Sequence, residues 1–274
     1  MIPAFVINLD RSTARLERIT QEFARAGLAF NRFPAIDGCR VPEELQPYFE
    51  GCTLLPGEIG CYASHLALWH LVADQGEPAL ICEDDVLLPD DLGQLLRDLL
   101  RTLPHGWDIV RLSSLAKRGV VPIEGRLAGG RHLIQYSREP TNAGATLVSP
   151  GGAAKLIKPR WIGRPVDQDV RCPWEFGLQT YGVVPRPIRE VPGGDSIIGA
   201  MGHRVHRTRG MSNLPACIAH NVRALGFSNW ARCLAWNTMG RKLVRSGAEW
   251  SHVREADAPL RRLGPAPATI ERPI

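Results

Sequence analysis

Short apolar segments alternate with amphipathic ones along most of the chain. The apolar segments are bounded by turn residues, which predicts strands. They lie at residues 3–9, 30–36, 79–83, 108–112 and 145–149. Apolar positions three and four residues apart predict helices after the first strand and over residues 58–73 and 91–102. This repeated strand–helix order predicts an α/β fold, with a mainly parallel sheet and helices on both of its faces.

Composition changes along the chain and predicts its organisation. Residues 39–57 are rich in proline and glycine and are expected to be irregular, whereas residues 115–140 form a mobile segment or a hairpin. Arginine, alanine, tryptophan and glycine dominate later, so we expect one domain over residues 1–210 and a basic, helical extension over residues 211–274. The Pro/Ala-rich end, residues 263–274, is expected to be disordered.

Three consecutive carboxylates, Glu83, Asp84 and Asp85, lie between two apolar runs. Such flanks favour burial, and buried negative charge is costly unless a cation neutralises it. A hard divalent cation with oxygen ligands is the natural partner, and a phosphate often completes its coordination shell. The triplet therefore indicates a metal-assisted nucleotide or sugar-nucleotide site. The alternative is an ordinary cluster of solvated surface acids.

Further polar residues fall where other predicted strands end. Asn8 and Asp10 follow the first strand, and Asp37 follows the second. In open α/β sheets, ligands bind beyond the carboxyl ends of the strands. We therefore expect these residues and the acidic triplet to converge on one edge of the sheet.

The composition is that of a soluble globular protein, with 274 residues, 44% hydrophobic and 22% charged. The N-terminus is expected to be a first strand and not a signal peptide. Seven cysteines, an odd number without a C-x-x-C pair, argue against a zinc framework and for reduced thiols in the cytosol. Cys61 and Cys82 lie in apolar surroundings and are predicted to be packing residues.

Positive charge is concentrated near the end of the chain. The net charge is +5, yet residues 203–262 alone hold eleven lysines or arginines against three acids. An anionic partner is expected, such as membrane lipid or lipopolysaccharide, with nucleic acid the less favoured choice. We therefore expect a cytoplasmic protein, peripheral on the inner face of the membrane. The alternative is a merely soluble, arginine-rich tail.

Five stretches resemble glycosyltransferase family 25, which includes lipooligosaccharide galactosyl- and glucosyltransferases and collagen galactosyltransferases. They are Val6-Ile7-Asn8-Leu9-Asp10-Arg11 with Arg15; Ala35-Ile36-Asp37-Gly38; Gly57-Glu58-Ile59-Gly60-Cys61 with Ser64-His65; Leu80-Ile81-Cys82-Glu83-Asp84-Asp85-Val86; and Pro165-Val166-Asp167. Order and spacing fit over roughly residues 3–200. The chain departs from the family pattern at residues 141–146, which weakens any inference about the sugar, and the part past residue 210 does not match.

The resemblance implies a GT-A-type (Rossmann-like) enzyme that inverts the anomeric carbon and uses a divalent metal, manganese or magnesium. It would transfer galactose or glucose from a UDP-sugar to a hydroxyl of a lipooligosaccharide or another glycan. Asp85 would hold the metal and act in catalysis, with His203 as a further metal ligand, although a lone surface histidine is the commoner outcome. The residues implied to bind the nucleotide-sugar are Asn8, Leu9, Arg11, Arg15, Ala35, Asp37, Gly38, Glu58, Ser64, His65, Glu83 and Asp84.

Asp167 is the candidate general base, because inverting transfer needs a group that takes the acceptor hydroxyl proton. A helix cap is its alternative role. His65 is assigned to the site wall or, equally, to the core, and Arg15 to phosphate binding or a solvated face. Glu58 organises the site or simply complements the helix dipole.

Two other functions compete with transfer. One is a non-catalytic protein that binds a sugar-nucleotide or glycan. The other, a metal-dependent phosphohydrolase, is weaker because no Walker-type glycine loop occurs in the sequence.

Overall fold

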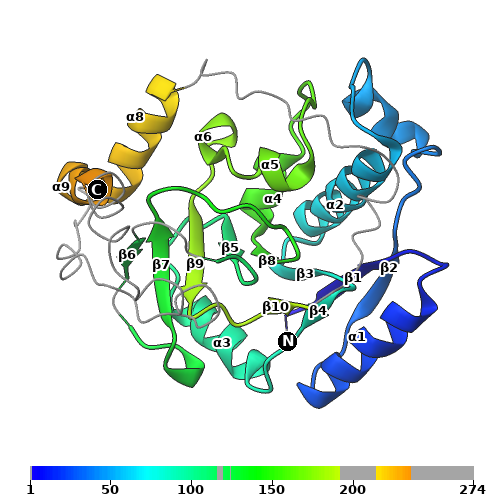
Figure 1. The fold of residues 1–274 in the computed structure, drawn as a ribbon, viewed down its shortest axis with the longest axis horizontal. Coiled ribbons are helices and arrows are strands. Elements are labelled where there is room, and N and C mark those ends of the chain that lie inside the picture. Colours follow the sequence, from blue (N-terminus) through cyan, green and yellow to red (C-terminus); the bar gives the residue numbers. More distant parts are fainter. Residues whose placement is uncertain (1, 116–119, 124, 192–213, 236–274) are drawn as a thin grey trace, which may run out of the picture.

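The computed structural model describes residues 2–115, 120–123, 125–191 and 214–235. Its centre is an eight-stranded sheet with the order β2-β1-β3-β8-β5-β9-β7-β6 (Figure 1). The strands are β1 (Ala4–Asn8), β2 (Asn31–Pro34), β3 (Ala79–Glu83), β5 (Ile109–Arg111), β6 (Val120–Pro122), β7 (His132–Tyr136), β8 (Ala145–Val148) and β9 (Thr180–Val184). A separate pair joins β4 (Val86–Leu87) to β10 (Arg189–Glu190).

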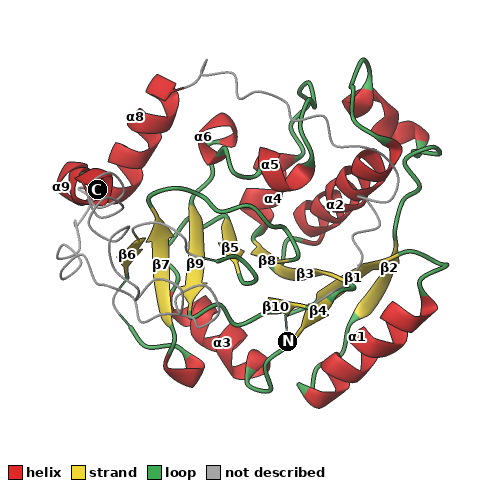
Figure 2. Cartoon of the chain, viewed as in Figure 1, coloured by secondary structure: helices red, strands yellow, loops and turns green. Residues whose placement is uncertain are grey.

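Helices cover both faces of the sheet (Figure 2). They are α1 (Thr13–Arg25), α2 (Pro56–Gln75), α3 (Leu92–Thr102), α4 (Pro150–Leu156), α5 (Val166–Asp169), α6 (Pro173–Phe176), α8 (Leu214–Leu225) and α9 (Phe227–Ala235), with 3-10 turns η1 (Glu43–Phe49) and η2 (Ala128–Gly130). The helices α2 and α4 lie on one face, and α1 and α3 lie on the other.

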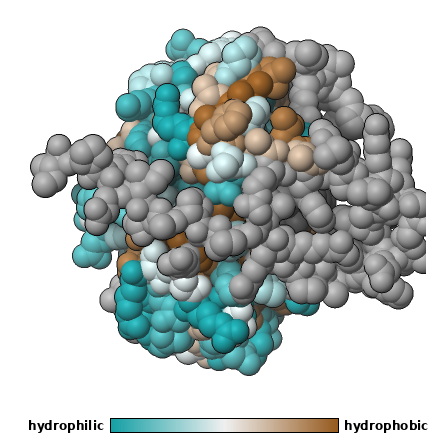
Figure 3. Space-filling model, turned by 90° about the vertical axis from the view of Figure 1, so that its left-hand side faces the viewer, coloured by the Kyte–Doolittle hydropathy of each residue, from teal (hydrophilic) through white to brown (hydrophobic). Residues whose placement is uncertain are grey.

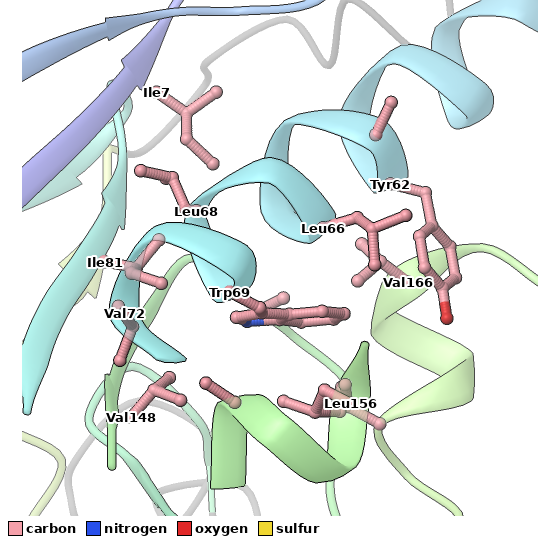
Figure 4. Close-up of a cluster of buried hydrophobic side chains, with 14 of the residues drawn as sticks. Ile7, Tyr62, Leu66, Leu68, Trp69, Val72, Ile81, Val148, Leu156 and Val166 are labelled. Carbon is pink, nitrogen blue, oxygen red and sulfur yellow. The ribbon is translucent and has the colours of Figure 1, made fainter. Parts of the chain in front are cut away.

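Strand periodicity explains why the sheet has two apolar faces. Side chains alternate along a strand, so Phe5 and Ile7 of β1 point to one face while Ala4 and Val6 point to the other. The first face packs against α2, whose Trp69 lies at the centre of the cluster in Figure 4. Both faces of β1 and the first four residues of β3 are therefore buried, as is usual for strands covered by helices on both sides.

The predicted α/β class, with helices on both faces, is confirmed. The sheet itself is mixed. Three neighbouring pairs are parallel (β1–β2, β1–β3 and β5–β9) and four are antiparallel. A parallel neighbour needs a crossover connection, usually a helix. The chain between β7 and β8 contains no helix, and β8 runs antiparallel to β3. The β2-β1-β3 half, where the polar motifs lie, is parallel as predicted.

Most predicted elements lie where the sequence placed them, and β3 matches its predicted bounds of 79–83. The segment 39–57 differs from the expectation because it contains η1. Within 115–140, β6 and β7 pair antiparallel, which bears out the hairpin alternative.

The helices α8 and α9 form the last described part of the chain and lie at the left in Figure 1. They carry exposed apolar side chains, including Leu214 and Phe227, which are 54% and 69% exposed. Figure 3 views this side of the molecule, where apolar surface gathers in the upper part. None of the described helices is both long and apolar enough to cross a membrane. The predicted boundary at residue 210 and the segment 263–274 lie outside the described residues.

Candidate functional site

The polar motifs of the first three strands meet at one edge of the sheet. The strands β1 and β3 are parallel neighbours, so their carboxyl ends lie together. Across this edge, the Asn8 side-chain amide donates a hydrogen bond to Asp84 Oδ2 at 2.7 Å. The backbone N–H of Ala35, after β2, donates to the Asn8 carbonyl at 2.9 Å. The convergence expected from the sequence is therefore present for Asn8 and the acidic triplet.

Adjacent acids of the triplet face different surroundings. Asp84 is buried and accepts hydrogen bonds from Asn8 and from Arg15 Nη1, the latter at 3.0 Å. Asp85 is more open, with a side chain 28% exposed and Arg15 Nη1 at 3.5 Å. Burial and the negative charge of Glu83 raise the pKa of Asp85 to about 6, and Arg15 opposes this shift only in part. Asp84 thus anchors the turn, and Asp85 carries charge that the protein does not fully neutralise.

Helix α2 supplies the facing wall. Glu58, in its first turn, accepts a hydrogen bond from the Leu55 backbone N–H at 3.0 Å. Cys61 and His65 are one turn apart and lie on the same side of the helix. His65 is buried, and its Nε2 lies 3.6 Å from Glu83 Oε1.

Negative charge surrounds Cys61. Burial, together with Glu83, Asp167, Asp85 and Glu58 in decreasing order, raises the pKa of the Cys61 thiol well above its usual range. Acids from α2, the β3 end and α5 therefore act on the same thiol. The site can be described as an acidic pocket, defined here by Glu58, Cys61, His65, Glu83, Asp85 and Asp167.

Asp167 is held in place by its neighbour Asp169. Asp169 is buried, accepts from the Tyr62 hydroxyl at 2.7 Å and from Arg164 Nη2 at 2.6 Å, and also contacts Arg160. These bonds fasten α5 to α2. The N-cap of α5 is Pro165, so Asp167 lies inside the first turn and is not the N-cap residue.

Ser64 and Gly38 join α2 to the loop after β2. The Ser64 hydroxyl donates to the Gly60 carbonyl at 2.7 Å and accepts from the Ile36 N–H at 2.9 Å. A Cβ at Gly38 would lie 1.8 Å from the Pro56 carbonyl oxygen, so this close approach of two backbone segments requires glycine. Both residues thus shape the pocket through backbone contacts, and direct binding of a ligand by them stays a prediction.

Other predicted site residues have simpler surroundings. Asp37 is exposed, and its carboxylate accepts from the Cys39 N–H at 2.9 Å. Leu9 and Arg11 lie in the turn after β1, with Arg11 exposed. His203 lies outside the described residues. Asp10 pairs with Arg32, which also donates to the Asn8 side-chain oxygen.

One hollow of about 800 Å³ lies elsewhere on the surface. Arg25, Arg131, Arg186 and Arg189 contribute to its lining, and no predicted site residue in the described chain does so. The acidic pocket is therefore identified by its side-chain chemistry and not by the volume of a cavity.

Cys61 confirms its predicted packing role and has a second role as well. It packs beside apolar residues, as predicted, but it also belongs to the acidic pocket. Cys61 and His65 are one helical turn apart, and this spacing was the sequence signal that could have placed Cys61 in the site. Arg160 and Arg164, which fix Asp169, had no such signal because their partner is set by the tertiary fold.

The residues of the pocket fit a hard divalent cation. Glu83 and Asp85 offer carboxylate oxygens, which such ions prefer. Burial and the neighbouring Glu83 raise the pKa of Asp85, and Arg15 opposes the shift only in part, so a bound cation would favour the ionised carboxylate. The buried Asp84 is already bonded to Asn8 and Arg15, so Glu83 and Asp85 are the better placed ligands of the triplet.

Comparison with known proteins agrees with this arrangement. Residues 1–119 match the sequence model of glycosyltransferase family 25, an LPS biosynthesis protein. A glycosyltransferase 25 family member of Aedes aegypti is 28% identical over 190 residues, which cover 63% of this chain and 30% of that protein. A probable inactive glycosyltransferase 25 family member 3 of Rattus norvegicus is 27% identical over 183 residues, covering 60% of this chain and 31% of that protein. A solved glycosyltransferase involved in glycosylation of the major capsid of PBCV-1 is similar over 70% of this chain and 95% of its own, with 10% identity and a TM-score of 0.38.

The fold and site define an α/β protein with a cation-compatible acidic pocket at the carboxyl edge of its sheet. Residues 1–119 match the model of glycosyltransferase family 25, which confirms the resemblance seen in the sequence. The chain spans about 30% of the length of the curated relatives that it matches. The family match ends at residue 119, before Asp167.

Proposed function

We propose that the protein is a GT-A-type glycosyltransferase that moves galactose or glucose from a UDP-sugar to a hydroxyl of a lipooligosaccharide or another glycan, with inversion. The observation that carries this proposal is the acidic triplet at the carboxyl edge of β3, which is bonded to Asn8 and Arg15 and lies against Cys61 and His65 of α2. The match of residues 1–119 to glycosyltransferase family 25 supports the class of reaction.

Asp167 serves as the general base in this proposal. Its carboxylate takes the proton of the acceptor hydroxyl while that oxygen forms a bond to the anomeric carbon. The bond from the anomeric carbon to the diphosphate oxygen breaks, and UDP leaves with the electron pair. The network around Asp169 holds α5 rigidly, which keeps the base in position.

Glu83 and Asp85 would hold a divalent ion, with Mn²⁺ or Mg²⁺ as the expected metal and His203 as a further candidate ligand. The ion, when bound, would neutralise charge on the departing diphosphate. Asn8 and Arg15 orient Asp84 and so fix the turn that carries Asp85. The exposed Arg11 is placed beside this edge, where a nucleotide phosphate would lie.

A non-catalytic sugar-nucleotide-binding protein is the second candidate. The relative from Rattus norvegicus that is named a probable inactive family member favours it. The presence of Glu83, Asp85 and Asp167 together in one pocket favours catalysis instead.

A donor screen tests the proposal. Purified protein is mixed with UDP-galactose, UDP-glucose or their N-acetyl relatives, with and without Mn²⁺, and followed by thermal unfolding and by UDP release. We expect one donor to raise the unfolding temperature in a Mn²⁺-dependent way and to be turned over, and the Asp85→Ala variant to lose this turnover while staying folded. Donor binding without turnover, with lipooligosaccharide acceptors supplied, would support the non-catalytic alternative. No response to any UDP-sugar would reject both functions.

We also propose that the protein works at the cytoplasmic face of the membrane, attached peripherally through its C-terminal segment. Exposed apolar residues on α8 and α9 and the positive charge of residues 203–262 support this proposal. Deleting residues 211–274 should weaken binding to anionic vesicles, and added salt should weaken binding of the full chain. Neutral phosphatidylcholine vesicles are the control. Equal binding by the truncated and full chains would contradict the proposal.

A further inference from the structure

His65 carries a buried nitrogen that lacks a hydrogen-bond partner. The side chain is 1% exposed, and its Nε2 has no partner among the residues that the structure describes. Glu83 Oε1, at 3.6 Å, lies beyond hydrogen-bond distance. A buried polar atom without a partner is destabilising, so it indicates a group that a ligand can satisfy.

Two more ligand atoms lie beside this nitrogen. Cys61 Sγ, a ring nitrogen of His65 and a carboxylate oxygen of Glu83 all lie within 4.8 Å of one another, and Nε2 is the His65 atom that faces Glu83. Cys61 and Glu83 are partly exposed, so an ion can reach the cluster from the pocket. A thiol, an imidazole and a carboxylate together are the donors that zinc and related ions use.

We infer that Cys61, His65 and Glu83 form a binding site for a thiolate-accepting transition-metal ion such as Zn²⁺ or Co²⁺. This site differs in chemistry from the oxygen-lined one proposed for Mn²⁺ or Mg²⁺, because sulfur and nitrogen ligands favour softer ions. The inference rests on the geometry of these side chains and stands whether or not the protein transfers sugar.

The spacing suits a small ion. Metal–ligand distances of about 2.0–2.3 Å place the ligands of a tetrahedral ion about 3.3–3.8 Å apart. The His65–Glu83 separation of 3.6 Å already lies in this range. Cys61 would approach by side-chain rotation. The Cys61 proton leaves to solvent as the metal–sulfur bond forms, and the ion's charge stabilises the thiolate.

Nearby acids favour cation binding at this site, and the shared ligand Glu83 makes the two metal sites compete. Glu58, Asp85 and Asp167 add negative charge around the thiol. Glu83 belongs to both sites, so an ion held by Cys61 and His65 withdraws Glu83 from the oxygen-lined site. Zn²⁺ bound by Cys61, His65 and Glu83 would therefore prevent Glu83 from binding Mn²⁺ or Mg²⁺ in the oxygen-lined site.

Cobalt titration tests the site without an activity assay. Co²⁺ added to the full-length protein should produce the near-ultraviolet absorption of a sulfur-to-cobalt bond, and Zn²⁺ should abolish it at concentrations where Mn²⁺ does not. Cys61→Ser should lose the absorption, and His65→Gln should weaken Co²⁺ binding by at least about tenfold. Cys217→Ser, on α8, is the matched control and should behave like wild type, whereas Asp85→Asn should bind Co²⁺ more weakly but keep the absorption, because Asp85 contributes charge and is not a ligand of this site.

Misfolding of a variant can be distinguished from loss of the metal site. Each variant is first compared with wild type by thermal unfolding, and the Cys61→Ser and His65→Gln results are judged at temperatures where both are folded. Absence of the absorption in folded wild type, or its persistence in Cys61→Ser, would overturn the inference. Loss in Asp85→Asn but not in His65→Gln would also overturn it, because cobalt would then lie in the oxygen-lined site.

Discussion

Two groups of carboxylates border α2, and they are neutralised to different extents. Asp169, which is 1% exposed, has a tyrosine hydroxyl and two arginines as partners. Asp85 shares its space with Glu83 and has one arginine at 3.5 Å, which also binds Asp84. The more deeply buried acid is therefore the better paired one.

This difference separates structural charge from functional charge. A buried carboxylate that serves the fold must have cations and donors in place, because an unpaired buried charge is strongly destabilising. The acidic pocket instead keeps unbalanced charge, which the folded protein tolerates at a cost in stability. Such a cost is typical of sites that bind a charged ligand. The four predictions that follow test this contrast.

The largest expected effect is on catalysis at Asp167. Asp167→Asn should bind the donor as wild type does but lower the transfer rate by about 10²–10⁴-fold, because the amide cannot accept the acceptor's proton. UDP release with donor and glycan acceptor measures the rate, and thermal shift measures donor binding. Transfer close to the wild-type rate would show that another group is the base.

Asp169 should behave in the opposite way, as a stability residue. Asp169→Ala removes the buried carboxylate that binds Arg160, Arg164 and the Tyr62 hydroxyl, while Glu175 still pairs with both arginines, and should lower the free energy of unfolding by about 3 kcal/mol. Urea denaturation measures this change. Asp90→Ala is the matched control, since Asp90 pairs with Arg25 on the surface with a side chain 74% exposed, and it should cost under about 1 kcal/mol. Equal losses of unfolding free energy in Asp169→Ala and Asp90→Ala would show that the buried carboxylate contributes no more to stability than the surface one.

Asp85→Asn should stabilise the protein. Because the folded-state pKa of Asp85 is raised from 3.8 to about 6, its ionisation disfavours folding. The penalty is absent below the lower value, grows as the pH rises between the two, and is complete above about 6. The variant should therefore gain about 1–3 kcal/mol in unfolding free energy near pH 7.5 and little near pH 4, in metal-free buffer.

Urea denaturation of wild type and Asp85→Asn at several pH values checks this expectation. Mn²⁺ should stabilise wild type more than the variant. A gain that does not change with pH, or a loss of stability at neutral pH, would show that Arg15 already neutralises Asp85.

The sequence predicted the local elements and the edge where they meet. Short apolar runs and periodic helices placed β1, β3 and α2, and the rule that polar residues follow parallel strands brought Asn8 and Asp84 together. The insertion of β8 between β3 and β5 was not predictable, because strand order depends on long-range pairing that leaves no periodic signal.

The detailed roles within the site were even less visible. Asp84 and Asp85 are adjacent and chemically identical, yet only the first is bound by both Asn8 and Arg15. Turn geometry after β3 decides which carboxylate points inward. The approach of Cys61 and His65 to Glu83 likewise follows from packing of α2 on the sheet, although their spacing of one turn was already present in the sequence.

Substitution of Glu58 has the smallest expected effect. Its carboxylate both stabilises the start of α2 and adds charge to the acidic pocket, so the substitution tests the two roles together. It bonds the Leu55 N–H at the start of α2, and its charge also reaches Cys61. Glu58→Gln keeps an oxygen acceptor but loses the charge that favours a helix N-terminus, so the free energy of unfolding should fall by only about 0.3–1 kcal/mol. Transfer should decrease less than in Asp167→Asn, since Glu58 then acts by positioning α2. A rate loss as large as that of Asp167→Asn, with unchanged stability, would instead place Glu58 in direct contact with the substrate.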